Sequence, residues 1–344
     1  MKAFWRTLAL PVLVNLTITC LLAAQNTAKD ASGVTTHQVW PGEVETIYTI
    51  SRIDSTKQPA LYYNPDHFVD EKPEQARPLL VALHTWSGTY RQRWSLDYWK
   101  LAKKHGMVFI HPHFRGANNK PEATGSKLAM SDILDAVSYA RRNANVDSSR
   151  IYLVGSSGGG YMALLMAGKH PDIWTAVSAW VPITDLERWY YQSKVLKQRY
   201  AADIENSCGG VPGCSDSVDY QYFQRSPIHF LTDAHVNLFA HVSDLPIDIN
   251  AGIRDGHDGA VPIDHSLYAF NALADSSDRI PESDIRYMVD WARIPEGYPE
   301  PPADSLYEDH MPLLRRHSNN VRLTIFDGAH QGLPGAAVEW LLAQ

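Results

Sequence analysis

Short, uninterrupted apolar runs recur through this chain, and stretches with helical spacing separate them. A strand with one buried face alternates apolar and polar residues, so these runs are typical of strands buried on both faces. Because helices alternate with the runs, the sequence predicts an α/β fold with a mostly parallel, twisted sheet and helices on both faces. The expected strands are Pro78–Leu83, Met107–His111, Arg150–Val154, Ala176–Val181, Ile247–Ala251 and Val321–Phe326.

Other segments complete this outline. Three stretches have helical spacing, and two stretches near the start alternate as the strands of an antiparallel hairpin do. The expected helices are Trp94–His105, Asp132–Asn143 and Tyr161–Lys169, and the expected hairpin strands are Val44–Ile50 and Pro59–Tyr63.

Two long segments interrupt the alternation. Residues 186–245 are rich in aromatic side chains, and we expect them to form a lid-like insertion that lies over the edge of the sheet. Residues 280–317 have the proline-containing composition of loops and are expected to form a second insertion. With these two insertions, residues 25–344 are predicted to form a single domain.

The first 24 residues have the pattern of a secretory signal peptide. Lys2 and Arg6 form a basic start, Leu8–Leu22 is apolar, and Ala23 and Ala24 are small enough for cleavage after them. We therefore expect residues 1–24 to be removed from a protein that is secreted or periplasmic, without stable membrane insertion after cleavage. The alternative interpretation is an uncleaved membrane anchor.

The composition excludes two broad classes. Hydrophobic residues make up 44% of 344 residues, so a large core forms and global disorder is excluded. The formal net charge of −7 is the opposite of what a nucleic-acid-binding protein needs to neutralise phosphates. No cofactor motif stands out. His111-Pro112-His113 has no further metal-ligand pattern beside it, so we expect a structural role for it and no bound metal.

Two cysteines remain after removal of the leader. Cys208 and Cys214 lie close together in a glycine-rich stretch, and an even number of cysteines in an exported chain indicates a disulfide bond. A metal site is the alternative, but two ligands are too few for one.

The sequence from Gly155 to Gly159 has the form G-x-S-x-G and lies between an expected strand and an expected helix. This context is that of a nucleophile elbow, in which a strained turn lifts the serine hydroxyl clear of the sheet. The spacing of the glycines favours Ser157 as the nucleophile over Ser156. The N–H of Gly158 is then expected at the start of a helix, facing a developing oxyanion. A glycine-rich phosphate loop or an ordinary turn is the alternative.

The candidate general base follows the last expected strand. His330 lies in a short loop after Val321–Phe326, flanked by glycines, where its ring can approach Ser157. The candidate acid is Asp255 or Asp258, since both follow the strand Ile247–Ala251. We favour Asp255 and leave Asp258 open. His257 competes weakly as the base, because it shares a loop with both acids.

A second oxyanion donor is expected after the first core strand. The serine, the acid and the histidine follow one another along this chain, which is the order of the α/β-hydrolase fold. In that fold the loop after the first core strand supplies a main-chain N–H. Here this loop begins at His84, so Thr85 or Trp86 is the expected donor. An ordinary loop is the alternative.

Together these residues resemble the catalytic domain of the prolyl oligopeptidase family. The stretches that carry the resemblance are Gly155–Met162, His170–Asp172, Trp180–Leu186, Arg225–Pro227, Val261–Pro262 and Gly328–His330. The resemblance implies an α/β-hydrolase fold with a triad of Ser157, Asp255 or Asp258, and His330. The propeller domain of that family is not expected, because the stretch before the first core strand is too short for it. Relatives without a propeller include esterases that deacylate polysaccharides.

The expected function is therefore that of a serine hydrolase with an acyl-enzyme intermediate. A carboxylic ester of a carbohydrate or small molecule is the favoured substrate, because several aromatic residues are expected near the mouth of the site and flat rings stack on sugars. A prolyl oligopeptidase-like serine peptidase is the first alternative, and an inactive binding protein on the same fold is the second. The aromatic residues expected at the mouth are Trp86, Trp180, Trp189, Tyr190 and Tyr191, of which Trp180, Trp189 and Tyr190 are the candidates for substrate binding.

Overall fold

The computed structural model describes residues 40–69, 74–231 and 242–344. The chain divides into two units, Met1–Pro41 and Gly42–Gln344, and the second unit contains the helices and strands of the described residues. The expected leader, residues 1–24, lies outside the described residues.

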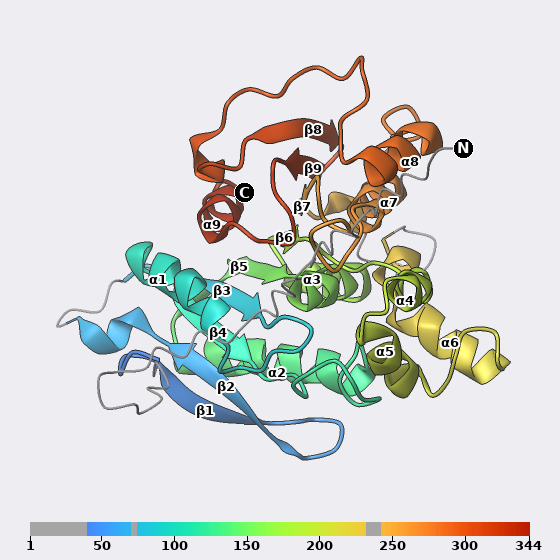
Figure 1. The fold of residues 1–344 in the computed structure, drawn as a ribbon. Coiled ribbons are helices and arrows are strands. Elements are labelled where there is room, and N and C mark those ends of the chain that lie inside the picture. Colours follow the sequence, from blue (N-terminus) through green and yellow to red (C-terminus); the bar gives the residue numbers. More distant parts are fainter. Residues whose placement is uncertain (1–39, 70–73, 232–241) are drawn as a thin grey trace, which may run out of the picture. The chain divides into compact units, whose positions relative to one another are not determined.

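A nine-stranded sheet runs through the second unit in the order β1-β2-β4-β3-β5-β6-β7-β9-β8 (Figure 1). Neighbouring strands from β4 to β9 pair in parallel, whereas β1, β2 and β8 pair antiparallel at the two edges. The predicted mostly parallel sheet is thus confirmed. The strands are β1 Glu45–Ile50, β2 Lys57–Tyr63, β3 Arg77–Leu83, β4 Val108–Pro112, β5 Val146–Ser156, β6 Ala176–Trp180, β7 Ile247–Gly252, β8 Pro312–Ser318 and β9 Val321–Phe326.

Helices cover both faces of the sheet. Helices α1 and α9 pack against each other and against the central strands, while α3 and α7 lie over the sheet from the other side (Figure 1). The core lies between these layers, and the apolar side chains of β3 to β6 are almost wholly buried there. The α-helices are α1 Leu96–Lys104, α2 Lys127–Asn143, α3 Gly158–Lys169, α4 Leu186–Val195, α5 Tyr200–Cys208, α6 Asp216–Arg225, α7 Asp264–Leu273, α8 Glu282–Trp291 and α9 Pro334–Leu342.

Helix α2 and strand β5 both begin earlier than expected. Helix α2 begins at Lys127 rather than at residue 132, because the Ser126 hydroxyl accepts a hydrogen bond from Ala129 N at 3.0 Å and caps the helix there. Strand β5 begins at Val146 rather than at residue 150, and its first residues are more polar and exposed than the apolar run that predicted it.

The two segments expected as insertions contain regular structure. Between β6 and β7 the chain forms α4, α5 and α6, which pack on one another and which we call the helical segment. Residues 232–241, also within the expected lid-like insertion, lie outside the described residues. The stretch expected as a second insertion contributes α8 and the edge strand β8, which the loop-like composition did not predict.

The expected disulfide bond is not found, since Cys208 and Cys214 are both free thiols. Cys208 is the last residue of α5 and is buried, whereas Cys214 is exposed in the turn that follows. Burial raises the pKa of the Cys208 thiol to about 12. Cys208 is buried at the end of a helix and Cys214 is exposed in the next turn, so closeness in sequence alone does not join them in a disulfide bond.

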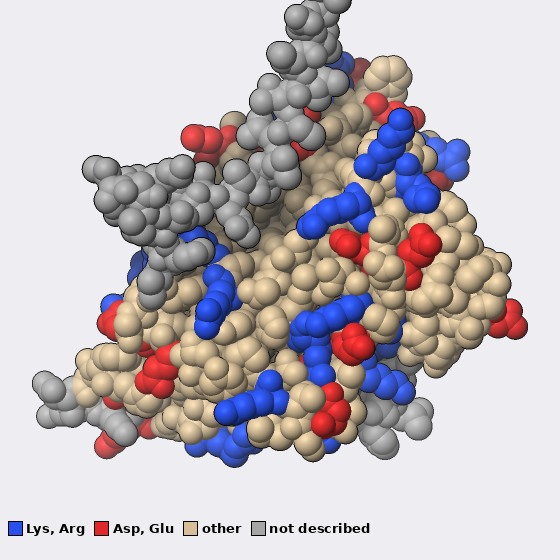
Figure 2. Space-filling model, turned by 60° about the horizontal axis from the view of Figure 1, so that its bottom comes forward, with Lys and Arg blue, Asp and Glu red and all other residues tan. Residues whose placement is uncertain are grey.

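Charged side chains of both signs lie on the face shown in Figure 2, where Asp and Glu groups lie among the Lys and Arg groups. That face therefore offers no uniformly basic surface of the kind that binds nucleic acid. Within the described residues, none of the helices is long and apolar enough to span a bilayer.

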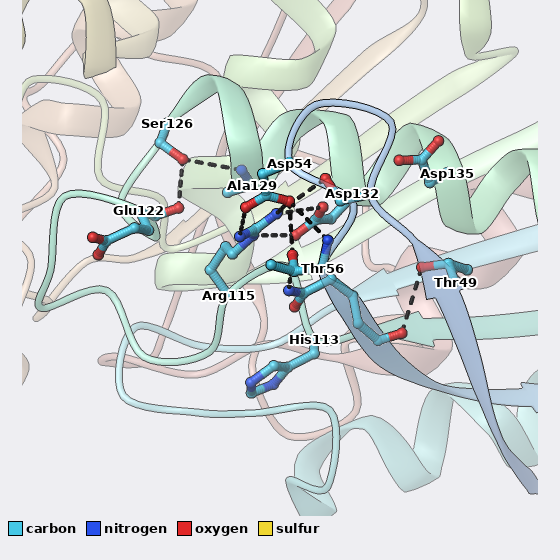
Figure 3. Close-up of polar contacts among 12 residues, drawn as sticks. Thr49, Asp54, Thr56, His113, Arg115, Glu122, Ser126, Ala129, Asp132 and Asp135 are labelled. Atoms are coloured by element: carbon cyan, nitrogen blue, oxygen red, sulfur yellow. Dashed lines mark hydrogen bonds and ion pairs between the residues drawn. The ribbon is translucent and has the colours of Figure 1, made fainter.

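Arg115 ties the turn between β1 and β2 to helix α2 (Figure 3). Its guanidinium donates to both carboxylate oxygens of Asp132, at 2.6 and 3.1 Å, and to both of Asp54, at 2.7 and 3.0 Å. Burial raises the pKa of Asp132, whereas the hydrogen bonds from Arg115 lower the pKa of Asp54. Because Asp132 is only 1% exposed, its charge depends on this partner.

Replacing Arg115 with methionine tests this network. We expect Arg115→Met to lower the free energy of unfolding by about 3–5 kcal/mol, because it leaves a buried carboxylate without its partner. The matched control is Arg52→Met, since Arg52 pairs with Asp135 at 2.6 Å but has a side chain that is 55% exposed. That control should lose at most about 1 kcal/mol. Equal losses for the two variants in urea unfolding would contradict the account.

Candidate active site

Ser157 stands at the point where β5 ends and α3 begins. Its backbone has φ 57° and ψ −122°, a conformation that costs a non-glycine residue about 1–3 kcal/mol. Two backbone hydrogen bonds hold it there: Ser157 N donates to Trp180 O, and Tyr161 N donates to Ser157 O, both at 2.8 Å. The local structure therefore has the strand, sharp turn and helix that the G-x-S-x-G pattern predicts.

The glycines on either side allow this turn to be so tight. A Cβ atom on Gly155 would lie 2.3 Å from the carbonyl carbon of Gly159, and one on Gly159 would lie 2.4 Å from Leu83 O. Both clashes involve backbone atoms, which have no room to move. The pattern thus requires glycine at these two positions for steric reasons.

His330 lies between Ser157 and Asp255. Its Nε2 is 2.8 Å from Ser157 Oγ, and its Nδ1 is 2.7 Å from Asp255 Oδ2. The second carboxylate oxygen of Asp255 accepts hydrogen bonds from Gly256 N at 3.0 Å and Val261 N at 3.2 Å. Asp255 is only 2% exposed, so these bonds satisfy a buried carboxylate and fix its direction.

The competing residues point elsewhere. Asp258 has a side chain that is 64% exposed, and its Oδ2 lies 3.4 Å from Arg254 Nε. His257 Nε2 faces the carbonyl oxygen of Val289 at 2.7 Å. Ser156 Oγ lies 3.3 Å from the Tyr98 hydroxyl. The structure therefore brings Ser157, His330 and Asp255 together and leaves the alternatives outside that group.

The loop after β3 lies against the start of α3. A Cβ atom on Gly158 would be 2.3 Å from Trp86 N, so the Trp86 amide is a close neighbour of Gly158. The N–H of Thr85 is already taken up, because it donates to Gln92 Oε1 at 3.0 Å. Within the described part of the chain, no hydrogen bond takes up the N–H of Trp86. Of the two candidates on this loop, Trp86 is thus the one with a free donor.

A buried histidine, His84, also holds this loop in place. The ring nitrogens of His84 lie 2.9 Å from Thr85 O and 2.8 Å from His113 O, and the ring stacks on Phe114 with centroids 3.8 Å apart. Burial lowers the pKa of His84 to about 4, so the ring is neutral at neutral pH. The ring of His84 therefore holds the loop in place through its hydrogen bonds and adds no charge to it.

The model of the prolyl oligopeptidase family matches residues 92–287, more than half of the chain. The chain belongs to the prolyl oligopeptidase family. This is a family of hydrolases, and the match together with the sheet order confirms the α/β-hydrolase fold.

Curated relatives match over shorter stretches. A feruloyl esterase B of Talaromyces funiculosus is 28% identical over 120 residues, which is 33% of this chain and 34% of that protein. An acetylxylan esterase of Coprinopsis cinerea is 30% identical over 122 residues, which is 32% of this chain and 33% of that protein. The chain thus spans about a third of the length of these relatives.

Solved structures resemble the chain over more of its length. An acylaminoacyl peptidase of Pyrococcus horikoshii superposes with a TM-score of 0.58 and 18% sequence identity, covering 87% of this chain and 40% of that one. At this identity the likeness shows the fold alone.

The three aromatic residues expected to bind substrate are buried. Trp180, Trp189 and Tyr190 are 0%, 1% and 3% exposed. Trp180 Nε1 donates to Ser178 Oγ, and Trp189 Nε1 donates to Ala260 O, each at 2.9 Å. The three rings are therefore packed in the interior, and the indole N–H groups of Trp180 and Trp189 both have acceptors. Trp86 is also buried, whereas Tyr191 is 51% exposed.

No cluster of three or more potential metal ligands occurs among the described residues. The two histidines weighed as metal ligands have other surroundings: His111 Nδ1 lies 2.6 Å from Ala82 O within the core, and the ring of Tyr90 packs on His113. Burial lowers the pKa of both histidines.

Three residues of this neighbourhood were not anticipated. Gln92 holds the loop after β3, Asp203 accepts a hydrogen bond from the Trp86 ring, and Gly259 lies against the Asp255 carboxylate. Gln92 and Asp203 belong to helix or loop patterns that carry no chemical motif. Gly259 follows the acid in sequence, and its closeness to a candidate acid is the one signal that could have pointed to it.

A methyl group at position 259 should disturb the pair of Asp255 and His330. A Cβ atom there would lie 2.2 Å from Asp255 Oδ1 and 2.7 Å from His330 Cβ. Since that carboxylate oxygen is held by two N–H groups, we expect Gly259→Ala to lower the free energy of unfolding by about 1–3 kcal/mol. Gly335→Ala is the control, because nothing lies within 4 Å of its Cβ position. Unchanged stability of Gly259→Ala in urea unfolding would show that the site is looser than described.

Proposed function

We propose that this protein is a serine hydrolase in which Ser157 is the nucleophile, His330 the general base and Asp255 the acid that orients it. The observation that carries the proposal is the continuous chain of hydrogen bonds from Asp255 through His330 to Ser157, with distances of 2.7 and 2.8 Å. Three residues far apart in sequence meet in the order that nucleophilic catalysis of acyl transfer needs.

The proposed reaction begins with proton transfer. His330 Nε2 takes the proton of Ser157 Oγ as that oxygen attacks the carbonyl carbon of the substrate. The carbonyl oxygen becomes an oxyanion, which accepts hydrogen bonds from the N–H groups of Gly158 and Trp86. Asp255 accepts the Nδ1–H of His330, so the correct ring nitrogen is left free to act as the base.

The tetrahedral intermediate then breaks down, and the alcohol and the carboxylic acid leave one after the other. His330 returns its proton to the leaving oxygen, the carbon–oxygen bond to the alcohol breaks, and the acyl group remains as an ester of Ser157. Water enters, His330 removes its proton, and the new hydroxide attacks the acyl carbon. Collapse of the second oxyanion releases the carboxylic acid, and Ser157 regains a proton from His330.

The substrate class that we propose is a carboxylic ester of a carbohydrate or a small molecule. Support comes from the relatives named feruloyl esterase and acetylxylan esterase. The serine peptidase alternative is favoured by the acylamino-acid-releasing enzyme 1 of Oryza sativa, which is 24% identical over 207 residues. We also propose that the protein is exported after removal of residues 1–24 and that residues 186–245 form a lid-like insertion.

A substrate panel tests the function and the nucleophile together. We expect the wild type to hydrolyse p-nitrophenyl acetate, acetylated xylan or a feruloyl ester with higher kcat/KM than a proline-containing peptide. Ser157→Ala should lower kcat by about 10⁶-fold, because members of a triad act as a unit. Ser156→Ala is the matched control, since its hydroxyl faces Tyr98, and it should keep most of the activity.

The other outcomes are informative as well. Peptide turnover without ester turnover would favour the peptidase. A folded wild type that turns over no substrate and is not labelled by a fluorophosphonate probe would favour an inactive binding protein.

The identity of the acid follows from a second pair of variants. We expect Asp255→Asn to lower kcat by about 10⁴-fold, because an amide at this position favours the wrong tautomer of His330. Asp258→Asn should leave kcat unchanged, since that side chain is 64% exposed and turned toward Arg254. A large loss in Asp258→Asn with little loss in Asp255→Asn would reverse the assignment.

A further inference from the structure

The ring of Trp86 is anchored by the helical segment, far away in sequence. Its Nε1 donates to Asp203 Oδ2 on α5 at 3.2 Å, and the residue is only 2% exposed. An indole N–H is a donor only, so a buried tryptophan needs an acceptor, and Asp203 supplies it. The two residues are 117 positions apart, which makes this a contact of tertiary structure.

Aromatic packing strengthens the same contact. The Trp86 ring meets the Trp189 ring edge to face, with centroids 4.7 Å apart and planes at 80°, and Trp189 stacks on Tyr200 at 4.8 Å. Arg199, one residue before α5, also donates a hydrogen bond to Ser87 Oγ on the loop. The loop after β3 is therefore held at successive residues by α4 and by the start of α5.

The backbone of Trp86 is fixed on its other side. Its carbonyl oxygen accepts a hydrogen bond from Asn118 N at 2.7 Å, while Gln92 holds Thr85, the preceding residue. The peptide N–H of Trp86 thus lies between a fixed carbonyl and a fixed ring, and it stays free beside Gly158. A donor that is held before the substrate arrives has no reorganisation cost in the transition state.

Asp203 is suited to hold the ring without taking part in the reaction. Its carboxylate is partly buried, and burial raises its pKa, while the hydrogen bond from Trp86 and the positive charge of Arg199 oppose that shift. The side chain contacts the indole N–H and does not contact Ser157, His330 or Asp255 in the described structure.

We propose that Asp203 is a positioning residue that holds the Trp86 amide in place as an oxyanion donor, so that the helical segment controls the rate of the chemical step. The inference rests on the proposed function, because it concerns the oxyanion site of that reaction. A displacement of the loop by about 1 Å is enough to cost up to 10²-fold in rate when a reacting group must be aligned.

Replacing the acceptor tests the proposal. We expect Asp203→Ala to lower kcat on p-nitrophenyl acetate by about 10- to 100-fold, with KM changed by less than about threefold, since the donor acts mainly in the transition state. Asp203→Asn should recover most of the lost kcat, because the amide oxygen still accepts the indole N–H. Glu205→Ala, on the same helix, is the control and should match the wild type.

A second variant removes the indole N–H of Trp86, which is the donor of the hydrogen bond to Asp203. Trp86→Phe keeps an aromatic ring and lacks the N–H, so it should lower kcat as Asp203→Ala does. The kcat of the double variant should then be little lower than that of either single variant, because both substitutions remove the same hydrogen bond. If Asp203→Ala folds poorly, Trp86→Phe still tests the proposal by itself, because it removes the same hydrogen bond and leaves Asp203 in place.

The outcomes separate the inference from the function on which it rests. An active wild type with an unaffected Asp203→Ala, a loss confined to KM, or additive losses in the double variant would overturn the role of Asp203 and leave the triad intact. A wild type that hydrolyses no ester would overturn the proposed function, and the inference with it.

Discussion

The strained backbone of Ser157 is the constraint on which the arrangement of the site depends. A φ of 57° at a serine persists only where the surroundings fix it, and here the carbonyl of Trp180 on one strand and the start of α3 do so. Gly155 and Gly159 are required because any Cβ atom would strike backbone. The parallel sheet therefore has a chemical consequence: it supplies the rigid frame that stabilises this turn.

The same frame explains why distant residues meet. The carboxyl ends of β5, β7 and β9 lie along one edge of the sheet, so the loops that follow them bring Ser157, Asp255 and His330 together. Two buried polar groups near this edge are fixed in different ways. Burial keeps the ring of His84 neutral, whereas the carboxylate of Asp255 accepts hydrogen bonds from backbone N–H groups. The helical segment adds a further support, through Asp203, to the loop that carries Trp86.

Sequence patterns predicted the parts of this molecule whose signals are local. The apolar runs predicted the parallel core, and the glycines around Ser157 predicted its turn, because both depend on residues near one another in the chain. The burial of Trp180 and Trp189 could not be predicted, since a tryptophan has the same sequence signature in a core and at an open surface. The contact between Trp86 and Asp203 depends on how α5 packs, and no spacing encodes it.

The most direct test of the central claim is to look for an acyl group on the nucleophile during turnover. The wild type can be mixed with a p-nitrophenyl ester, quenched with acid while substrate is in excess, digested, and mapped by mass spectrometry. The account predicts an added acyl mass on the peptide that contains Ser157, at the serine itself. Rapid turnover with Ser157 unmodified, or with the acyl group on another side chain such as Ser156, would contradict it.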